Sequence, residues 1–262
     1  MRISSRISST NRFLENKNGG DIHLRHFYNL SSESEIVMKC SSRTCLFWRC
    51  LFYMIGIILL AVGLTLNTKA SLGVAPVITL PFVIASILPI DFATATFSVY
   101  FIFVCIQLAL NRNRPKIKIL LQFPFSFFFS LLLRLFSALL AINISGKAQG
   151  LLLLAASIVI TAGGICLMVN MNYIANPADG LAHTIADSLN KNTGTGKNIL
   201  DCSCVLFACV LIIATGTSRS AIGVGTLISM IGVGRILALF NRLFQRKMLL
   251  LCGMVPEATP CK

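Results

Sequence analysis

The chain has 262 residues, of which 55% are hydrophobic and 12% are charged, and its mean hydropathy is +0.80. These values exclude a soluble globular domain and are typical of a protein with several membrane-spanning helices. The formal charge of +14 comes from basic residues in the N-terminal region and in short polar segments. That distribution is expected of cytoplasmic loops beside anionic lipid, and it does not indicate nucleic-acid binding.

The N-terminal region, residues 1–45, is rich in Ser, Asn and charged residues and has no helical periodicity. This composition predicts a disordered cytoplasmic tail. Met38 stands just ahead of the first apolar run, so the sequence leaves open whether translation starts at Met1 or at Met38. At the other end, residues 245–262 are expected to form a second cytoplasmic tail.

Six apolar runs predict membrane-spanning helices, because each approaches or exceeds the ~20 residues that cross a ~30 Å hydrocarbon layer. They cover residues 46–68, 92–110, 119–142, 151–169, 199–215 and 222–243. Two further helices, at 76–88 and 177–189, begin with a proline after a polar break and are too short to span. If neither short helix crosses, the basic cluster at 112–118 falls on the cytoplasmic side with both termini, as the positive-inside tendency requires.

The second half of the chain repeats the first at a fixed offset of 101 residues. The offset carries Gly63 to Gly164, Pro76 to Pro177, and Arg134 to Arg235. An ungapped register of this length predicts an internal duplication, with one membrane repeat at 46–148 and the other at 149–244. Three spans in each repeat predict that the two are inverted relative to one another, each with a short broken or re-entrant helix.

A polar cluster at the second short helix is the strongest candidate for a binding site. Asn176 precedes Pro177 and is expected to cap the helix, with Asn172 in the turn before it. Asp179, His183 and Asp187 follow at intervals of four residues and therefore share one helix face. This acid–imidazole–acid stripe predicts a polar cavity reached from the cytoplasm. The alternative is a polar loop and surface helix at the membrane edge.

Other conspicuous residues have two interpretations each. Lys69 follows the first span and is a candidate binding residue in an outer loop. Arg134 and Arg235 lie near span ends; these arginines either reach the lipid headgroups or contact an anion or another helix. Asp201 is expected to cap the start of its span. Structural roles are expected for Gly73, Pro76, Pro177, Gly223 and Gly225, through close packing of helices and through helix starts.

Three stretches resemble a known family of bacterial inner-membrane proteins, the YczE/YitT-like family. Residues 63–66 with 70–76 resemble its first-repeat signature, residues 176–181 resemble the second-repeat version, and residues 221–227 resemble the glycine-rich start of its last span. The resemblance covers about residues 49–244. It implies a multi-pass protein of the inner membrane, and it implies little about activity, because the family's biochemistry is poorly defined.

The sequence therefore predicts an all-α polytopic membrane protein that resembles a transporter for a small polar solute or ion. The alternative is a non-catalytic accessory or structural protein that acts through a partner. An enzyme is disfavoured, since no nucleophile–base pair, nucleotide-binding loop or metal-ligand spacing is present. No cofactor, metal or nucleic-acid partner is expected beside the lipid bilayer. The substrate, the coupling ion and the oligomeric state do not follow from the sequence.

Overall fold

The computed structural model describes residues 43–111, 116–142, 146–216 and 221–252. All regular secondary structure in these ranges is helical, and six helical segments are long and apolar enough to cross a membrane. The prediction of an all-α polytopic membrane protein is thus confirmed. The six segments are Cys45–Lys69, Phe92–Leu110, Ile117–Leu139, Lys147–Met171, Thr193–Thr215 and Val224–Leu251.

The helices follow the predicted order, with differences at their ends. They are α2 (Arg43–Lys69), α3 (Pro76–Ile87), α4 (Phe92–Leu110), α5 (Ile117–Leu120), α6 (Gln122–Leu139), α7 (Lys147–Met171), α8 (Pro177–Ser188), α9 (Thr193–Thr215) and α10 (Val224–Leu251). The predicted repeat boundary at residue 244 falls inside α10, so the expected C-terminal tail begins as a continuation of that helix. The expected N-terminal tail lies almost entirely outside the described residues.

The two short helices, α3 and α8, have the same length and the same kind of start. Each has 12 residues and a proline in its first turn. At about 1.5 Å per residue, twelve residues reach about 18 Å, which is well short of the ~30 Å hydrocarbon layer. Each is followed by a spanning helix that begins at an Asx cap, because Asp91 and Asn192 accept hydrogen bonds from the backbone N–H groups of Thr94 and Thr195.

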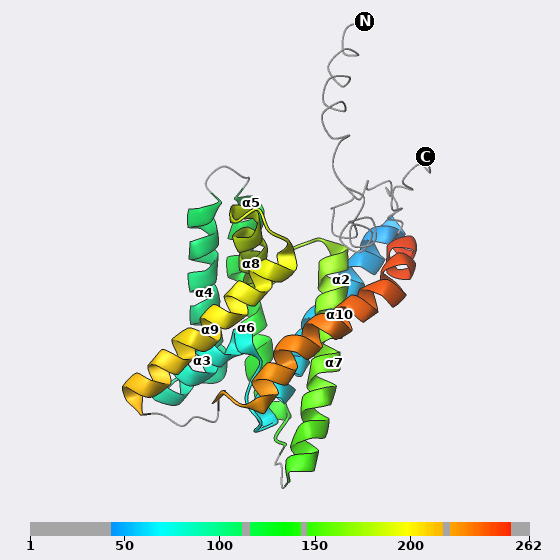
Figure 1. Ribbon diagram of the computed structural model, residues 1–262. Helices are drawn as coiled ribbons and strands as arrows, with labels where there is room; N and C mark the ends of the chain where they lie inside the picture. Colours follow the sequence, from blue (N-terminus) through cyan, green and yellow to red (C-terminus); the bar gives the residue numbers. More distant parts are fainter. Residues whose placement is uncertain (1–42, 112–115, 143–145, 217–220, 253–262) are drawn as a thin grey trace, which may run out of the picture. The chain divides into compact units, whose positions relative to one another are not determined.

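The helices associate in two groups, which Figure 1 shows side by side. One group consists of α2, α7 and α10, and the other consists of α3, α4, α6, α8 and α9. Several contacts occur in pairs that the 101-residue offset relates. α3 packs on α9 as α8 packs on α4, and α2 packs on α6 as α7 packs on α10. Each short helix therefore lies against a spanning helix of the opposite half of the chain.

The close packing of α2 on α7 depends on glycines at related positions. A Cβ atom added at Gly164 would lie 2.6 Å from the backbone nitrogen of Leu60 and 2.8 Å from the carbonyl oxygen of Gly56. At Gly63, an added Cβ would lie 2.7 Å from the backbone nitrogen of Thr161. Without a water-driven hydrophobic effect inside a bilayer, such close backbone contact is a main source of helix association.

The turn before α3 is held against the start of α10 by backbone contacts. Gly225 N–H donates a hydrogen bond of 2.8 Å to the carbonyl of Leu72. Gly73 has a φ of +100°, a left-handed conformation that favours glycine, and a Cβ on Gly223 would clash with the Leu72 oxygen. Larger residues at Gly73 or Gly223 would separate the two segments, which accounts for these glycines structurally.

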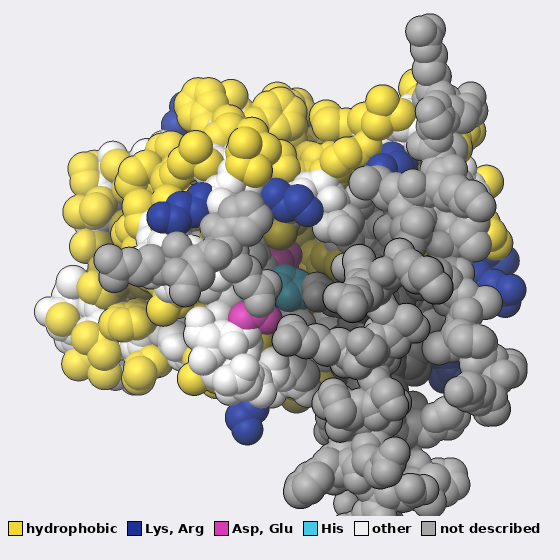
Figure 2. All heavy atoms as spheres, turned by 90° about the horizontal axis from the view of Figure 1, so that it is seen from above, with side chains coloured by type: hydrophobic (Ala, Val, Ile, Leu, Met, Phe, Trp, Pro, Cys, Tyr) yellow, Lys and Arg dark blue, Asp and Glu magenta, His cyan; other side chains and the backbone are white. Residues whose placement is uncertain are grey.

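The surface of the described helices suits a lipid environment. Leu152, Ile213 and Val224 are among many large apolar side chains that are mostly exposed, at 72%, 82% and 70%. Figure 2 shows hydrophobic side chains over much of the visible surface at one end, with Lys and Arg side chains between them. In water such a surface would drive aggregation, so we interpret it as the lipid-facing exterior.

Candidate functional site

Helix α8 is fixed in the protein by polar contacts with α4 and α6. The Gln107 side-chain amide donates to the Pro177 carbonyl at 3.0 Å and to Gln122 Oε1 at 2.9 Å. Gly180 makes room for this pair, because an added Cβ would lie 2.6 Å from Gln107 Oε1. One turn later Thr184 Oγ1 accepts a 2.8 Å hydrogen bond from the Asn111 amide. The first turn of α8 therefore has a fixed position.

Asn176 occupies the N-cap position of α8, but its side chain makes no capping hydrogen bond. The prediction of an Asn cap is wrong in this respect. The side-chain Nδ2 lies 3.5 Å from the hydroxyl of the fully buried Tyr100, and Oδ1 accepts no hydrogen bond from any described residue. Asn176 is only 5% exposed, so an acceptor oxygen is buried without a donor, which is costly unless something else supplies one.

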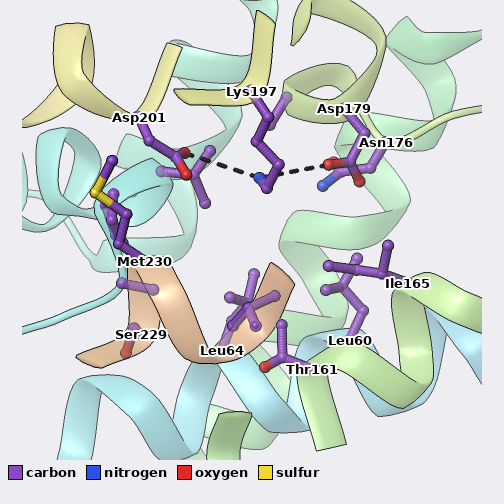
Figure 3. Close-up of a pocket in the computed structure, with 15 residues that line it drawn as sticks. Leu60, Leu64, Thr161, Ile165, Asn176, Asp179, Lys197, Asp201, Ser229 and Met230 are labelled. Atoms are coloured by element: carbon purple, nitrogen blue, oxygen red, sulfur yellow. Dashed lines mark ion pairs between the residues drawn. The ribbon is translucent and has the colours of Figure 1, made fainter. Parts of the chain in front are cut away.

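Lys197 lies between two carboxylates at the start of α9. Its Nζ atom is 3.7 Å from Asp179 Oδ1 and 3.8 Å from Asp201 Oδ1. The side chains of Lys197, Asp179 and Asp201 are 27%, 15% and 6% exposed. Figure 3 shows Lys197 reaching between the two acids. Both distances exceed that of a direct hydrogen bond, and Asp201 Oδ1 accepts none.

These three charged residues and Asn176 line a small cavity with about 40 Å³ of water-accessible volume. The wall comes from α2, α3, α7, α8, α9 and α10, and both short helices contribute their first turns. Leu60 and Leu64 of α2 form much of the apolar wall opposite the charges (Figure 3). The polar lining residues are Thr161, Asn176, Asp179, Lys197, Asp201 and Ser229.

The cavity lies where the two halves of the chain meet, but its charges come from the second half alone. Leu60 and Thr161, which the 101-residue offset relates, both line it. The same offset pairs the charged Asp179 with Ile78 and the charged Asp201 with Tyr100. Ile78 and Tyr100 are both completely buried. The charged lining residues therefore have no charged counterpart at these two offset-related positions.

The remaining predicted residues of the polar stripe lie outside the cavity. His183 is exposed, and its Nδ1 is 3.4 Å from the Thr193 hydroxyl. Asp187 is exposed one turn further along α8. Asn172 is exposed and caps the C-terminus of α7 in a left-handed conformation, with a φ of 50°. The stripe therefore runs from the cavity at Asp179 outward along α8.

None of the other predicted cations lines the cavity. Arg134 is exposed and forms an ion pair with Asp91, with Nη2 at 2.7 Å from Oδ1. Hydrogen bonds from Arg134 lower the pKa of the Asp91 carboxyl to about 2, so it is ionised at neutral pH. Lys69 ends α2 and is partly buried, while Arg235 is exposed and forms no ion pair within the described part of the chain. The structure brings none of them together.

The sequence prediction did not include Lys197 and gave Asp201 only a capping role. That role is wrong, because α9 begins six residues earlier than predicted, with Asn192 as its N-cap, and Asp201 lies two turns inside the helix. A Lys and an Asp four residues apart, just before a long apolar run, were a usable signal. No group of three or more His, Cys, Asp and Glu side chains in the described residues could hold a metal ion.

Comparison with family models matches residues 47–242 to a family of unknown function (DUF6198). The chain belongs to this family. Comparisons with curated proteins and with solved structures give no match. The match covers both short helices and all the charged residues of the cavity, so this site is within the family's shared region. The likeness to the YczE/YitT-like family stays a resemblance of short motifs.

Proposed function

We propose that this protein is a transporter of a small polar solute or ion, and that the cavity containing Asp179, Lys197 and Asp201 is its binding site. The observation that carries the proposal is this charge cluster. Ionisable side chains inside a membrane protein are costly and are generally retained for binding or transport. The start of two non-spanning helices at one cavity is the arrangement by which many secondary transporters hold their substrates.

We further propose that the two halves are inverted repeats in the inner membrane, with both termini in the cytoplasm. The equal lengths and starts of α3 and α8 and the paired helix contacts support this. Reporter fusions after Leu110 and after Leu251 should read cytoplasmic, whereas a fusion near Lys147 should read external. An external reading after Leu110 with a cytoplasmic reading at Lys147 would contradict the inverted arrangement.

A transport assay tests the proposed function directly. Liposomes with the purified protein should take up at least one component of a defined mixture of amines, amino acids and inorganic salts, as measured by mass spectrometry of their contents. Asp179→Asn should reduce that uptake at least tenfold, because it removes a charge from the cavity and preserves the side chain's shape. Asp187→Asn is the matched control, since it makes the same change at an exposed position of the same helix.

An accessory role is the second candidate, and one observation favours it: the first half of the chain contributes no charged residue to the cavity. An accessory protein acts through a partner and should transport nothing by itself. If protein-containing liposomes accumulate no more of any component than protein-free ones, the transport proposal fails and the accessory role is favoured.

A further inference from the structure

We propose that the cavity binds a small monovalent cation, and that Lys197 is a tethered counter-ion which this cation displaces. The inference deepens the proposed function, since it assigns a substrate or coupling-ion class to the same site. It rests on three features of the cavity: the chemistry of the atoms that lack a hydrogen bond, the balance of acidic and basic side chains, and the distances around Lys197.

The cavity atoms that lack a hydrogen bond are acceptors. Asn176 Oδ1 and Asp201 Oδ1 accept no hydrogen bond from any described residue, and these residues are only 5% and 4% exposed. Both residues line the cavity. With the Asp179 carboxylate they supply three oxygen-bearing groups, from the start of α8 and from α9. Carboxylate and carbonyl oxygens are the ligands that hard cations prefer, and they also accept from an ammonium group.

Several of the backbone donors that would favour an anion are engaged or missing. Helix starts carry partial positive charge, and both α3 and α8 begin at this cavity. However, Ala75 N–H already donates to Asn67 Oδ1 at 2.6 Å, and Ile78 N–H donates to the Ala75 carbonyl at 3.0 Å. Proline has no N–H group, which removes one donor from each first turn. Within α8, the Asp179 carboxylate already compensates the positive end of the helix dipole. Gly180 N–H donates a hydrogen bond to the Asn176 carbonyl.

The charge balance is suited to one additional positive charge. The cavity lining contains two aspartates and one lysine, so it has one more acidic than basic side chain. Lys197 Nζ contacts neither acid at hydrogen-bond distance, and its side chain is 27% exposed, more than either acid. The flexible four-carbon stem of lysine lets the ammonium move outward while a smaller cation takes its place between the carboxylates. Lys197 would then return when the cation leaves.

Thermal unfolding of the purified protein tests binding without requiring transport. The probes are Na⁺, K⁺, NH₄⁺ and methylammonium chloride, at constant ionic strength maintained with N-methyl-D-glucamine, which is too large for the cavity. At least one probe should raise the unfolding temperature saturably, as a ligand of the folded state does. Inorganic ions and amines are tested separately, so the result also shows which class of cation binds.

Variants at the cavity test whether the cation binds between the carboxylates in competition with Lys197. Asp201→Asn should weaken the apparent affinity at least tenfold, whereas Asp187→Asn should leave it unchanged. Lys197→Met should strengthen it at least tenfold, because the competing internal cation is removed. The inference is overturned if no probe shifts the wild type or Lys197→Met, or if Asp201→Asn binds as well as the wild type. Saturable binding without liposome uptake would support the cation site and contradict transport. Uptake that does not depend on a cation would support transport and contradict the cation site.

Discussion

Replacing Lys197 with methionine should lower the free energy of unfolding by about 3–5 kcal/mol, when measured with N-methyl-D-glucamine as the only cation. Methionine approximates the length of the lysine stem but carries no charge. The change leaves Asp179 and Asp201, whose side chains are 15% and 6% exposed, without an ion-pair partner among the described residues. Removing one partner of a buried ion cluster costs more than the cluster itself contributes, because uncompensated charge remains buried.

A double variant tests that physical reason. Lys197→Met with Asp201→Asn should recover most of the lost stability, because only one buried carboxylate then remains. Lys191→Met is the control, because Lys191 is exposed and lies just before α9. It should change the free energy of unfolding by no more than about 0.5 kcal/mol. Denaturation in detergent provides all four values of the double-variant cycle. Equal stability of wild type and Lys197→Met would contradict the burial of an interacting charge cluster.

The fold was predictable from the sequence because membrane-spanning helices have a strong local signal. Apolar length alone identified the six spans, and Pro76 and Pro177 marked the first residues of the short helices correctly. The start of α9 was missed because residues 193–198 are polar. They extend the helix beyond the apolar run, beginning at the Asn192 cap. Hydropathy locates the part of a helix in the hydrocarbon layer and not its capped end.

The candidate site was only partly predictable, because it depends on contacts between distant elements. Asn176 and Asp179 were found from local spacing, and both line the cavity. Periodicity also linked them to His183 and Asp187, since a helix face continues past the point where neighbouring helices cover it. Lys197 could not be assigned to Asp179 from sequence, because their pairing arises from the packing of α8 on α9.

The packing of Gly196 on α8 explains how Lys197 comes near Asp179. A Cβ at Gly196 would approach the Ala182 carbonyl of α8 closely, so α9 lies tightly against α8 beside Lys197. Glycine in a span is common, and its sequence context does not reveal which helix it contacts. The 101-residue offset relates the starts of the two short helices, but Ile78 and Tyr100 show that it does not relate the charges.

Accessibility to a water-soluble thiol reagent distinguishes the cavity from the other two environments in the protein. In a background without native cysteines, Val77→Cys and Met230→Cys would line the cavity. Ile213→Cys would lie on the apolar exterior, because Ile213 is 82% exposed. Ala208→Cys would lie in the packed core, because Ala208 is 0% exposed. Thiol reagents of this kind require water and a thiolate, so exposure to lipid does not permit reaction.

The most direct measurement is the labelling rate of these four cysteines in intact membranes with a small cationic methanethiosulfonate. A hydrated, net-negative binding cavity predicts that Val77→Cys and Met230→Cys react at least tenfold faster than Ile213→Cys and Ala208→Cys. It also predicts that an anionic reagent of similar size reacts more slowly at the two cavity positions. If the cavity cysteines react no faster than Ala208→Cys, the charged cluster is sealed within the protein and does not bind a solute or ion.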